Sequence, residues 1–211
     1  MWLNQRRNSF FELSDQGRIG LELFFGRDLK KKLIAVVVPM TSMKTNLTRP
    51  EKSPLFRLAL PSIAKTLQTD LDVYDVHVYA GFDATDPFWH DVAPADRMVG
   101  RIGVRFIECA CTSMVCNTNC VARRAYGDGA EYILRSNDDT EFSTVDWGSK
   151  LAAALWGLNP PNVGVVGPVC RQGNTKILTH DFTHRTHLEI MNMDYYPSVF
   201  ENWFCDDWSG S

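Results

Sequence analysis

Short apolar runs alternate with amphipathic segments along most of this chain. The run at 33–39 is continuous and β-branched, which is typical of a strand buried on both faces. Further strands are predicted at 73–82, 104–107, 132–134 and 163–168, with 176–182 as a candidate sixth strand. Helical spacing of apolar residues predicts helices at 54–67, 117–126 and 147–156. This alternation indicates an α/β fold with a mostly parallel, Rossmann-like central sheet flanked by helices.

The length of 211 residues fits a single domain, of which 1–31 is interpreted as a peripheral hairpin or helix. The formal net charge of −3 argues against a protein that binds nucleic acid through a general basic field. No apolar run approaches ~20 residues, so no membrane span is expected and a cytoplasmic location is predicted.

Six cysteines are present, and none of them forms a CxxC pair. A chain of this length does not need disulfide bonds for stability, so free thiols in a reducing compartment are expected. A soft-metal site at Cys111, Cys116 and Cys120 is disfavoured, because no second pair of ligands follows at a suitable spacing.

The most informative stretch is the segment 131–142, in which a short apolar strand ends in Asp138 and Asp139. Adjacent carboxylates repel each other and lose hydration when buried, so a fold keeps them mainly where a cation offsets the repulsion. Oxygen ligands suit a hard divalent ion such as Mg²⁺ or Mn²⁺, which at the carboxyl end of a strand is placed to bind a diphosphate. The alternative is a solvated acidic turn after an edge strand.

Other polar residues also follow predicted strands, with Thr41 and Ser42 after the first strand and Asp83 after the second. Ligands of parallel sheets bind beyond the carboxyl ends of the strands, so these residues are binding candidates, although Asp83 also suits a turn. Asn119 and Arg123 lie four positions apart on one helix face, from which they would contact a base or phosphate unless the face is solvated. No GxxxxGK[ST] or GxGxxG motif is present, which argues against a P-loop or dinucleotide site.

The last quarter of the chain concentrates histidines and aromatic residues. His180, His184 and His187 lie close together; the last two are candidates for a further metal or diphosphate contact, with a structural role as the alternative for each. Trp203 and Trp208 flank a second aspartate pair at 206–207, where aromatic faces suit sugar stacking and a carboxylate can deprotonate a hydroxyl. Taken alone, this segment favours a packed aromatic cluster with a helix-capping aspartate.

In type and order these motifs resemble those of GT-A fold glycosyltransferases, over roughly residues 32–208. The resemblance identifies 32–142 as a nucleotide-sugar-binding half and 143–211 as an acceptor-side half. The run Asp206-Asp207-Trp208 is similar to that of inverting enzymes of the N-acetylglucosaminyltransferase I type. The chain also resembles the amino-terminal glycosyltransferase domain of a larger, multidomain chlorovirus protein. That likeness implies further domains downstream in the same polypeptide and, for a viral protein, a location in the host cytoplasm.

The resemblance also implies residue roles. Asp139 would bind Mn²⁺ or Mg²⁺ in a DXD-type turn whose first position is Asn137. The candidate further ligand, His187, comes from the histidine cluster rather than from the resemblance. Asp207 would be the catalytic base that deprotonates the acceptor hydroxyl. The implied donor-binding residues are Thr41, Asp83, Asn119, Arg123 and Asp138.

The substrates implied by the resemblance are a UDP-sugar donor, with a thymidine donor as the alternative, and a glycan acceptor. The implied activity is a metal-dependent transfer of a hexosyl or related sugar with inversion. Two other functions stay open: a sugar nucleotidyltransferase, and a non-catalytic carbohydrate- or nucleotide-binding module. The segment Pro39–Lys44 lacks the glycine-rich, basic loop that usually follows the first strand of a nucleotidyltransferase.

Overall fold

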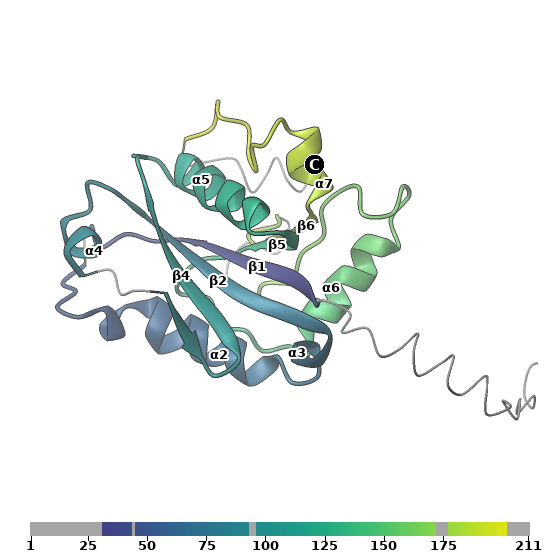
Figure 1. Ribbon diagram of the computed structural model, residues 1–211, viewed down its shortest axis with the longest axis horizontal. Coiled ribbons are helices and arrows are strands. Elements are labelled where there is room, and N and C mark those ends of the chain that lie inside the picture. The colour runs from purple at the N-terminus through teal and green to yellow at the C-terminus, as the bar shows by residue number, and fades with distance from the viewer. Residues whose placement is uncertain (1–30, 44, 93–95, 172–176, 202–211) are drawn as a thin grey trace, which may run out of the picture. The chain divides into compact units, whose positions relative to one another are not determined.

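The computed structural model describes residues 31–43, 45–92, 96–171 and 177–201, which belong to one compact unit. The central sheet of this part has the strand order β3-β4-β2-β1-β5-β6 (Figure 1). Parallel strands form its middle: β1 (Lys32–Pro39), β2 (Tyr74–Asp83), β4 (Ile102–Cys109) and β5 (Ala130–Arg135). The antiparallel edge strands are β3 (Arg97–Val99) and β6 (Asp181–His184). The predicted mostly parallel α/β sheet is confirmed, whereas the peripheral segment expected before residue 31 lies outside the described residues.

Helices cover both faces of this sheet (Figure 1). One face packs against α5 (Met114–Gly127) and α7 (Thr186–Ile190). The other packs against the π-helix η2 (Leu55–Ala59), which follows η1 (Pro50–Lys52), and against α2 (Leu60–Thr66), α3 (Asp70–Val73), α4 (Pro87–Val92) and α6 (Trp147–Trp156). Five successive β1 residues, 34–38, are fully buried, because alternate side chains enter the two opposite cores. The β-branched run of β1 therefore has the two-sided burial that its sequence predicts.

The strand order reverses at β1, with β2 and β4 on one side of it and β5 on the other. The Ser136 N–H donates to the Val37 carbonyl oxygen at 2.9 Å, which holds the start of the loop after β5 against the end of β1. In open α/β sheets, ligands bind beyond the carboxyl edge at such a reversal point. The loops after β1 and β5 are therefore the first place to look for a binding site.

Two aspartates join the start of α6 to the connection between α2 and α3. The Asp146 carboxylate accepts hydrogen bonds from the N–H groups of Gln68 and Thr69 at 2.9 and 2.8 Å. The buried Asp70 accepts a bond from the Gly148 N–H at 2.7 Å. A Cβ atom at Gly148 would lie 2.8 Å from Asp70 Oδ2, so glycine allows this close approach. These contacts fix α6 at a defined place on the sheet.

Two strand predictions near the C-terminal end are wrong. Residues 163–168 contribute only an isolated bridge between Val166 and Phe182, and the last strand among the described residues is Asp181–His184 rather than 176–182. Gly164 has a φ of 131°, which interrupts an extended run, and Pro168 has no N–H to donate to a ladder. These backbone constraints outweigh the β-branched composition of the segment.

Four of the cysteines are paired in disulfides, Cys109–Cys120 and Cys111–Cys116. The expectation of free thiols is wrong for these four, because packing of α5 behind β4 brings the paired Cα atoms to 6.2 and 5.6 Å. Their sulfur atoms are therefore not available as a soft-metal site. The cytoplasmic location stays a prediction. No described helix combines the length and apolar character needed to cross a membrane.

Candidate functional site

The acidic pair lies in a tight turn directly after β5, as its sequence predicts. The Thr140 N–H donates to the Asn137 carbonyl oxygen at 3.4 Å across this turn. Two residues later, the Phe142 N–H donates to the Ser62 Oγ of α2 at 3.0 Å. The turn is thereby held at the carboxyl edge of the sheet, where the strand order reverses.

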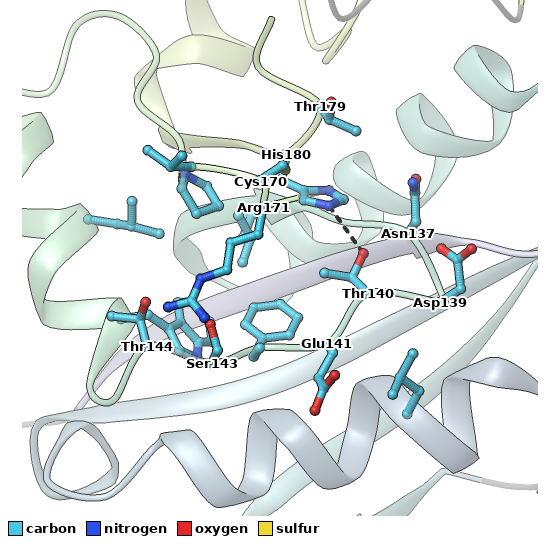
Figure 2. Close-up of a pocket in the computed structure, with 17 residues that line it drawn as sticks. Asn137, Asp139, Thr140, Glu141, Ser143, Thr144, Cys170, Arg171, Thr179 and His180 are labelled. Carbon is cyan, nitrogen blue, oxygen red and sulfur yellow. Dashed lines mark hydrogen bonds between the residues drawn. The ribbon is translucent and has the colours of Figure 1, made fainter. Parts of the chain in front are cut away.

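A pocket of about 670 Å³ borders this turn (Figure 2). Its remaining walls come from η2, α6, the segment 168–171 and residues 179–180. In Figure 2 the Arg171 side chain reaches across the pocket toward Ser143 and Thr144. Four residues of the turn face this space: Asn137, Asp139, Thr140 and Glu141. The pocket therefore combines acidic, basic and apolar groups.

The two carboxylates have different surroundings. Asp138 is partly buried, and its burial, followed by the charge of Asp139, raises its pKa from 3.8 to about 6. Asp139 is exposed and lines the pocket. A cation beside this pair would favour both charged forms and lower the Asp138 pKa again.

The fit of the turn to a divalent metal depends on what else can act as a ligand. Within the described ranges, no group of three His, Cys, Asp or Glu side chains is arranged to hold a metal ion. The Asp139 carboxylate and the Asn137 amide both lie on the pocket wall (Figure 2). Mg²⁺ is usually bound by one or two carboxylates, with water and substrate phosphates as its remaining ligands. These residues therefore fit an ion that is shared with a diphosphate.

Two pocket residues were not assigned a role from the sequence. His180 is 7% exposed, and its Nε2 lies 3.2 Å from Thr140 Oγ1. Burial, followed by the charge of Arg135, lowers the pKa of His180 to about 4, so its imidazole is neutral at pH 7. Arg171 is exposed, and in the described part of the chain no hydrogen bond or ion pair holds its guanidinium. A free guanidinium on a pocket wall suits an anionic ligand.

The predicted nucleoside-binding residues Thr41 and Asp83 lie at the carboxyl edge but outside the pocket lining. Thr41 Oγ1 donates to the buried Asp86 carboxylate at 3.3 Å. Asp83 Oδ1 accepts bonds from the N–H and the hydroxyl of Thr85, both at 2.7 Å. Asp83 thus makes the turn-forming contacts expected from the alternative interpretation of this residue.

Asn119 and Arg123 share a face of α5, and that face packs against the C-terminal segment rather than the acidic turn. The Asn119 amide donates to the Tyr196 carbonyl oxygen at 2.9 Å. Its Oδ1 accepts bonds from the N–H groups of Tyr195 and Tyr196, both at 2.9 Å. Arg123 forms an ion pair with Asp194. The structure therefore does not bring these two residues to the pocket beside Asp139.

The candidate metal ligand His187 also lies outside this pocket. Its Nε2 is 2.8 Å from the Tyr195 carbonyl oxygen, and the two rings are 5.2 Å apart. His184 lies on β6, where its Nε2 is 3.8 Å from a carboxylate oxygen of Glu131. Of the three histidines singled out, only His180 lines the pocket with Asp139.

The predicted catalytic base Asp207 lies outside the described residues, as do Trp203 and Trp208. The described chain ends at Glu201, whose carbonyl oxygen accepts a bond from the Val115 N–H at 3.0 Å. Val115 is in the first turn of α5, which begins soon after the carboxyl end of β4. Residue 201 therefore reaches the same edge of the sheet as the acidic turn.

No family model and no curated protein matches the chain. Among solved structures, it is similar to residues 1–349 of TarS from S. aureus, with 15% identity and a TM-score of 0.45 over 79% of this chain and 50% of that one. A protein assigned as a nucleotide-diphospho-sugar transferase, from Desulfovibrio desulfuricans G20, shares 11% identity with a TM-score of 0.43 over 72% of this chain and 64% of that one. The 4-diphosphocytidyl-2C-methyl-D-erythritol synthase of Anaerococcus prevotii DSM 20548 shares 12% identity with a TM-score of 0.47, over 81% of this chain and 79% of that one. The chain spans half of that TarS fragment and just under two thirds of the second protein.

Proposed function

We propose that this protein is a GT-A glycosyltransferase that transfers a sugar from a nucleoside diphosphate, with uridine as the expected base, to a hydroxyl group of a glycan. The observation that carries the proposal is the paired-carboxylate turn after β5, which lies beside β1 on the wall of a pocket of about 670 Å³. A reversal of strand order is a nucleotide-binding position, and the pocket volume is in the usual range for small-molecule sites.

The residues of the turn and pocket have complementary roles in this proposal. Asp139 would hold Mn²⁺ or Mg²⁺, and Asp138 would act through the ribose, the donor sugar or metal-bound water. When bound, the divalent ion supplies Lewis-acid stabilisation of the charge that develops on the departing diphosphate. Arg171 is placed to neutralise phosphate from another wall.

Asp207 is proposed as the base because of its motif, Asp206-Asp207-Trp208. The chain up to residue 201 leads to the carboxyl edge of the sheet, which is where an acceptor would meet the donor. The carboxylate would remove the proton of the acceptor hydroxyl as that oxygen attacks the anomeric carbon. Because the hydroxyl attacks from the face opposite the diphosphate, a single displacement inverts the configuration.

Calorimetry of UDP and a panel of UDP-sugars, with Mn²⁺ and with EDTA, tests the donor site. Wild-type protein is expected to bind in a metal-dependent way, and Asp139→Ala is expected to lose that dependence. Asp72→Ala is the matched control, because it removes an exposed carboxylate of α3 that pairs with Arg101 at 3.0 Å. Metal-dependent binding that survives in Asp139→Ala would contradict the proposal.

Product analysis then separates the proposed reaction from the other functions. Asp207→Asn is expected to bind the donor normally and to lower transfer by ~10²–10⁴-fold, the usual contribution of a general base. Sugar binding without turnover in the wild-type protein would favour a binding module, and release of inorganic diphosphate would favour a nucleotidyltransferase.

The loop after β1 argues against the nucleotidyltransferase alternative. The N–H and the hydroxyl of Ser42 donate to the Asp86 carboxylate at 2.6 and 2.5 Å, and the Thr41 hydroxyl donates to it at 3.3 Å. These donors are therefore used inside the protein. A loop that binds a triphosphate needs such groups directed outward.

A further inference from the structure

The acidic turn has weak backbone support between two firm anchors. It begins at Ser136, whose N–H is bonded to β1 at 2.9 Å, and it is next held at Phe142, whose N–H is bonded to α2 at 3.0 Å. Between them, the Thr140–Asn137 backbone bond is 3.4 Å long, beyond the usual range for a strong N–H···O bond. The direction of the Asp139 carboxylate therefore depends on what else holds the turn.

A hydrogen bond between the Thr140 hydroxyl and the His180 ring also holds the turn (Figure 2). His180 Nε2 lies 3.2 Å from Thr140 Oγ1. The Nδ1 of the same ring is buried and has no hydrogen-bond partner in the described part of the chain. The contact with Thr140 is thus the one side-chain hydrogen bond recorded for this imidazole among the described residues.

Contacts on several sides hold the backbone around His180, so its ring can act as an anchor. Arg135 donates to the carbonyl oxygen of the preceding Thr179 at 2.6 Å. On another side, a Cβ atom at Gly167 would lie 2.3 Å from the His180 carbonyl oxygen, so the backbone at Gly167 packs directly against the backbone of His180. Phe182, two residues later, is bonded in both directions to Val166 at 2.6 and 3.1 Å.

We propose that Thr140 and His180 form a positioning pair that fixes the acidic turn and directs the Asp139 carboxylate into the pocket. This inference rests on the proposed function, because it assigns the pair to the metal-dependent step of donor binding. Both residues act through Asp139 and neither needs to touch the ion. Because the buried imidazole is neutral, it can form a hydrogen bond with the Thr140 hydroxyl without adding a charge beside the ion.

Hydrogen–deuterium exchange of the turn tests the pair without any ligand. Thr140→Val removes the hydroxyl at nearly constant volume, and Thr140→Ser keeps it. Amides of 137–141 are expected to exchange about three- to tenfold faster in Thr140→Val and at the wild-type rate in Thr140→Ser, consistent with one partly buried neutral hydrogen bond. Thr118→Val is the matched control, because its hydroxyl bonds within α5 to the Met114 carbonyl oxygen at 2.9 Å. Wild-type exchange in Thr140→Val would refute the pair, whether or not the protein binds nucleotides.

Calorimetry with UDP and Mn²⁺ tests the functional part. Thr140→Val and His180→Phe are each expected to weaken Mn²⁺-dependent UDP binding about three- to tenfold, and the double variant no further, because both remove one interaction. Added to Asp139→Ala, Thr140→Val is expected to have no effect. If His180→Phe fails to fold, the Thr140 variants carry the test. If the turn exchanges faster in Thr140→Val but UDP binding is unchanged, the pair has no role in binding. If the wild-type protein binds no UDP, the proposed function is refuted, and the exchange experiment alone decides whether the pair holds the turn.

Discussion

Asp86→Asn is the sharpest test of how the loop after β1 is held. The Asp86 side chain is fully buried. Its Oδ2 accepts bonds from the Ser42 N–H at 2.6 Å and the Thr41 hydroxyl at 3.3 Å. Its Oδ1 accepts bonds from the Ser42 hydroxyl at 2.5 Å and the Trp89 N–H at 3.2 Å. One carboxylate therefore joins the carboxyl end of β1 to α4.

Asparagine keeps the shape of this group but cannot keep its bonds. In one amide orientation the new NH₂ faces the Ser42 N–H, and in the other it faces the Trp89 N–H. A hydroxyl can rotate to accept a bond, whereas a backbone N–H cannot, so either orientation leaves one buried donor unpaired. An unpaired buried donor costs about 1–3 kcal/mol, and the lost charge adds about 1 kcal/mol, so we expect about 2–4 kcal/mol of destabilisation. For a chain of this length, that lowers Tm by about 5–15 °C.

The same change has a defined pH signature. Burial alone would raise the pKa of Asp86, but the bonds from Ser42, Trp89 and Thr41 outweigh it and hold the pKa below its ordinary value of 3.8. A carboxyl group with a lowered folded-state pKa contributes stability above its unfolded pKa and loses it as the pH falls through the folded value. The difference between wild type and Asp86→Asn should therefore be complete at pH 7 and shrink as the pH falls below about 4.

Urea unfolding followed by tryptophan fluorescence at pH 7 and pH 3 measures both quantities. Subtracting the free energies of unfolding of the two proteins at each pH removes the effect of the other carboxylates, which titrate in both. A difference below about 1 kcal/mol at pH 7, or one that is the same at both pH values, would refute the reasoning.

Three further changes test the packing around the site. Gly81→Ala should destabilise the fold by at least ~2 kcal/mol in urea unfolding, because its Cβ would lie 2.1 Å from Val121 Cγ2; a wild-type midpoint would contradict that contact. Reduction of the two disulfides should lower the free energy of unfolding by about 2–4 kcal/mol, and four cysteines should resist alkylation until reductant is added, whereas immediate alkylation of all six would show that the pairs do not form. Tyr196→Phe removes a 2.7 Å bond to the buried Asp181 and should cost about 1–3 kcal/mol in thermal unfolding, with an unchanged Tm as the opposing result.

The sequence determined those elements whose signal is local. The β-branched run at 33–39 became β1 within one residue at its start, and the helix predicted at 147–156 became α6 with the same ends. The position of the acidic turn was also readable, because an apolar strand that ends abruptly in two carboxylates leaves few other conformations. The edge of the sheet on which a ligand would bind was readable from these elements as well, since the carboxyl ends of parallel strands meet at one edge.

Only the tertiary structure decided which distant residues surround that turn. His180 is 40 positions from Thr140, and its neighbours His184 and His187 have much the same local sequence signal, so the chain alone gave no reason to prefer one. The run 163–168 needed a partner strand to complete a ladder, and its Gly164 and Pro168 prevented that. Asn119 shared a helix face with Arg123 as predicted, but the packing of residues 193–196 decided what that face contacts.

The cysteines show the same division most clearly. Their number and spacing are identical in a reduced and an oxidised protein, and bonding requires Cα atoms to approach within about 7 Å. That approach is set by where α5 packs against the sheet, which depends on core contacts of the whole helix rather than on the thiols themselves. Local periodicity therefore determined the elements and the acidic turn, and long-range packing determined the pairings, because contacts between distant residues are fixed only when the complete core forms.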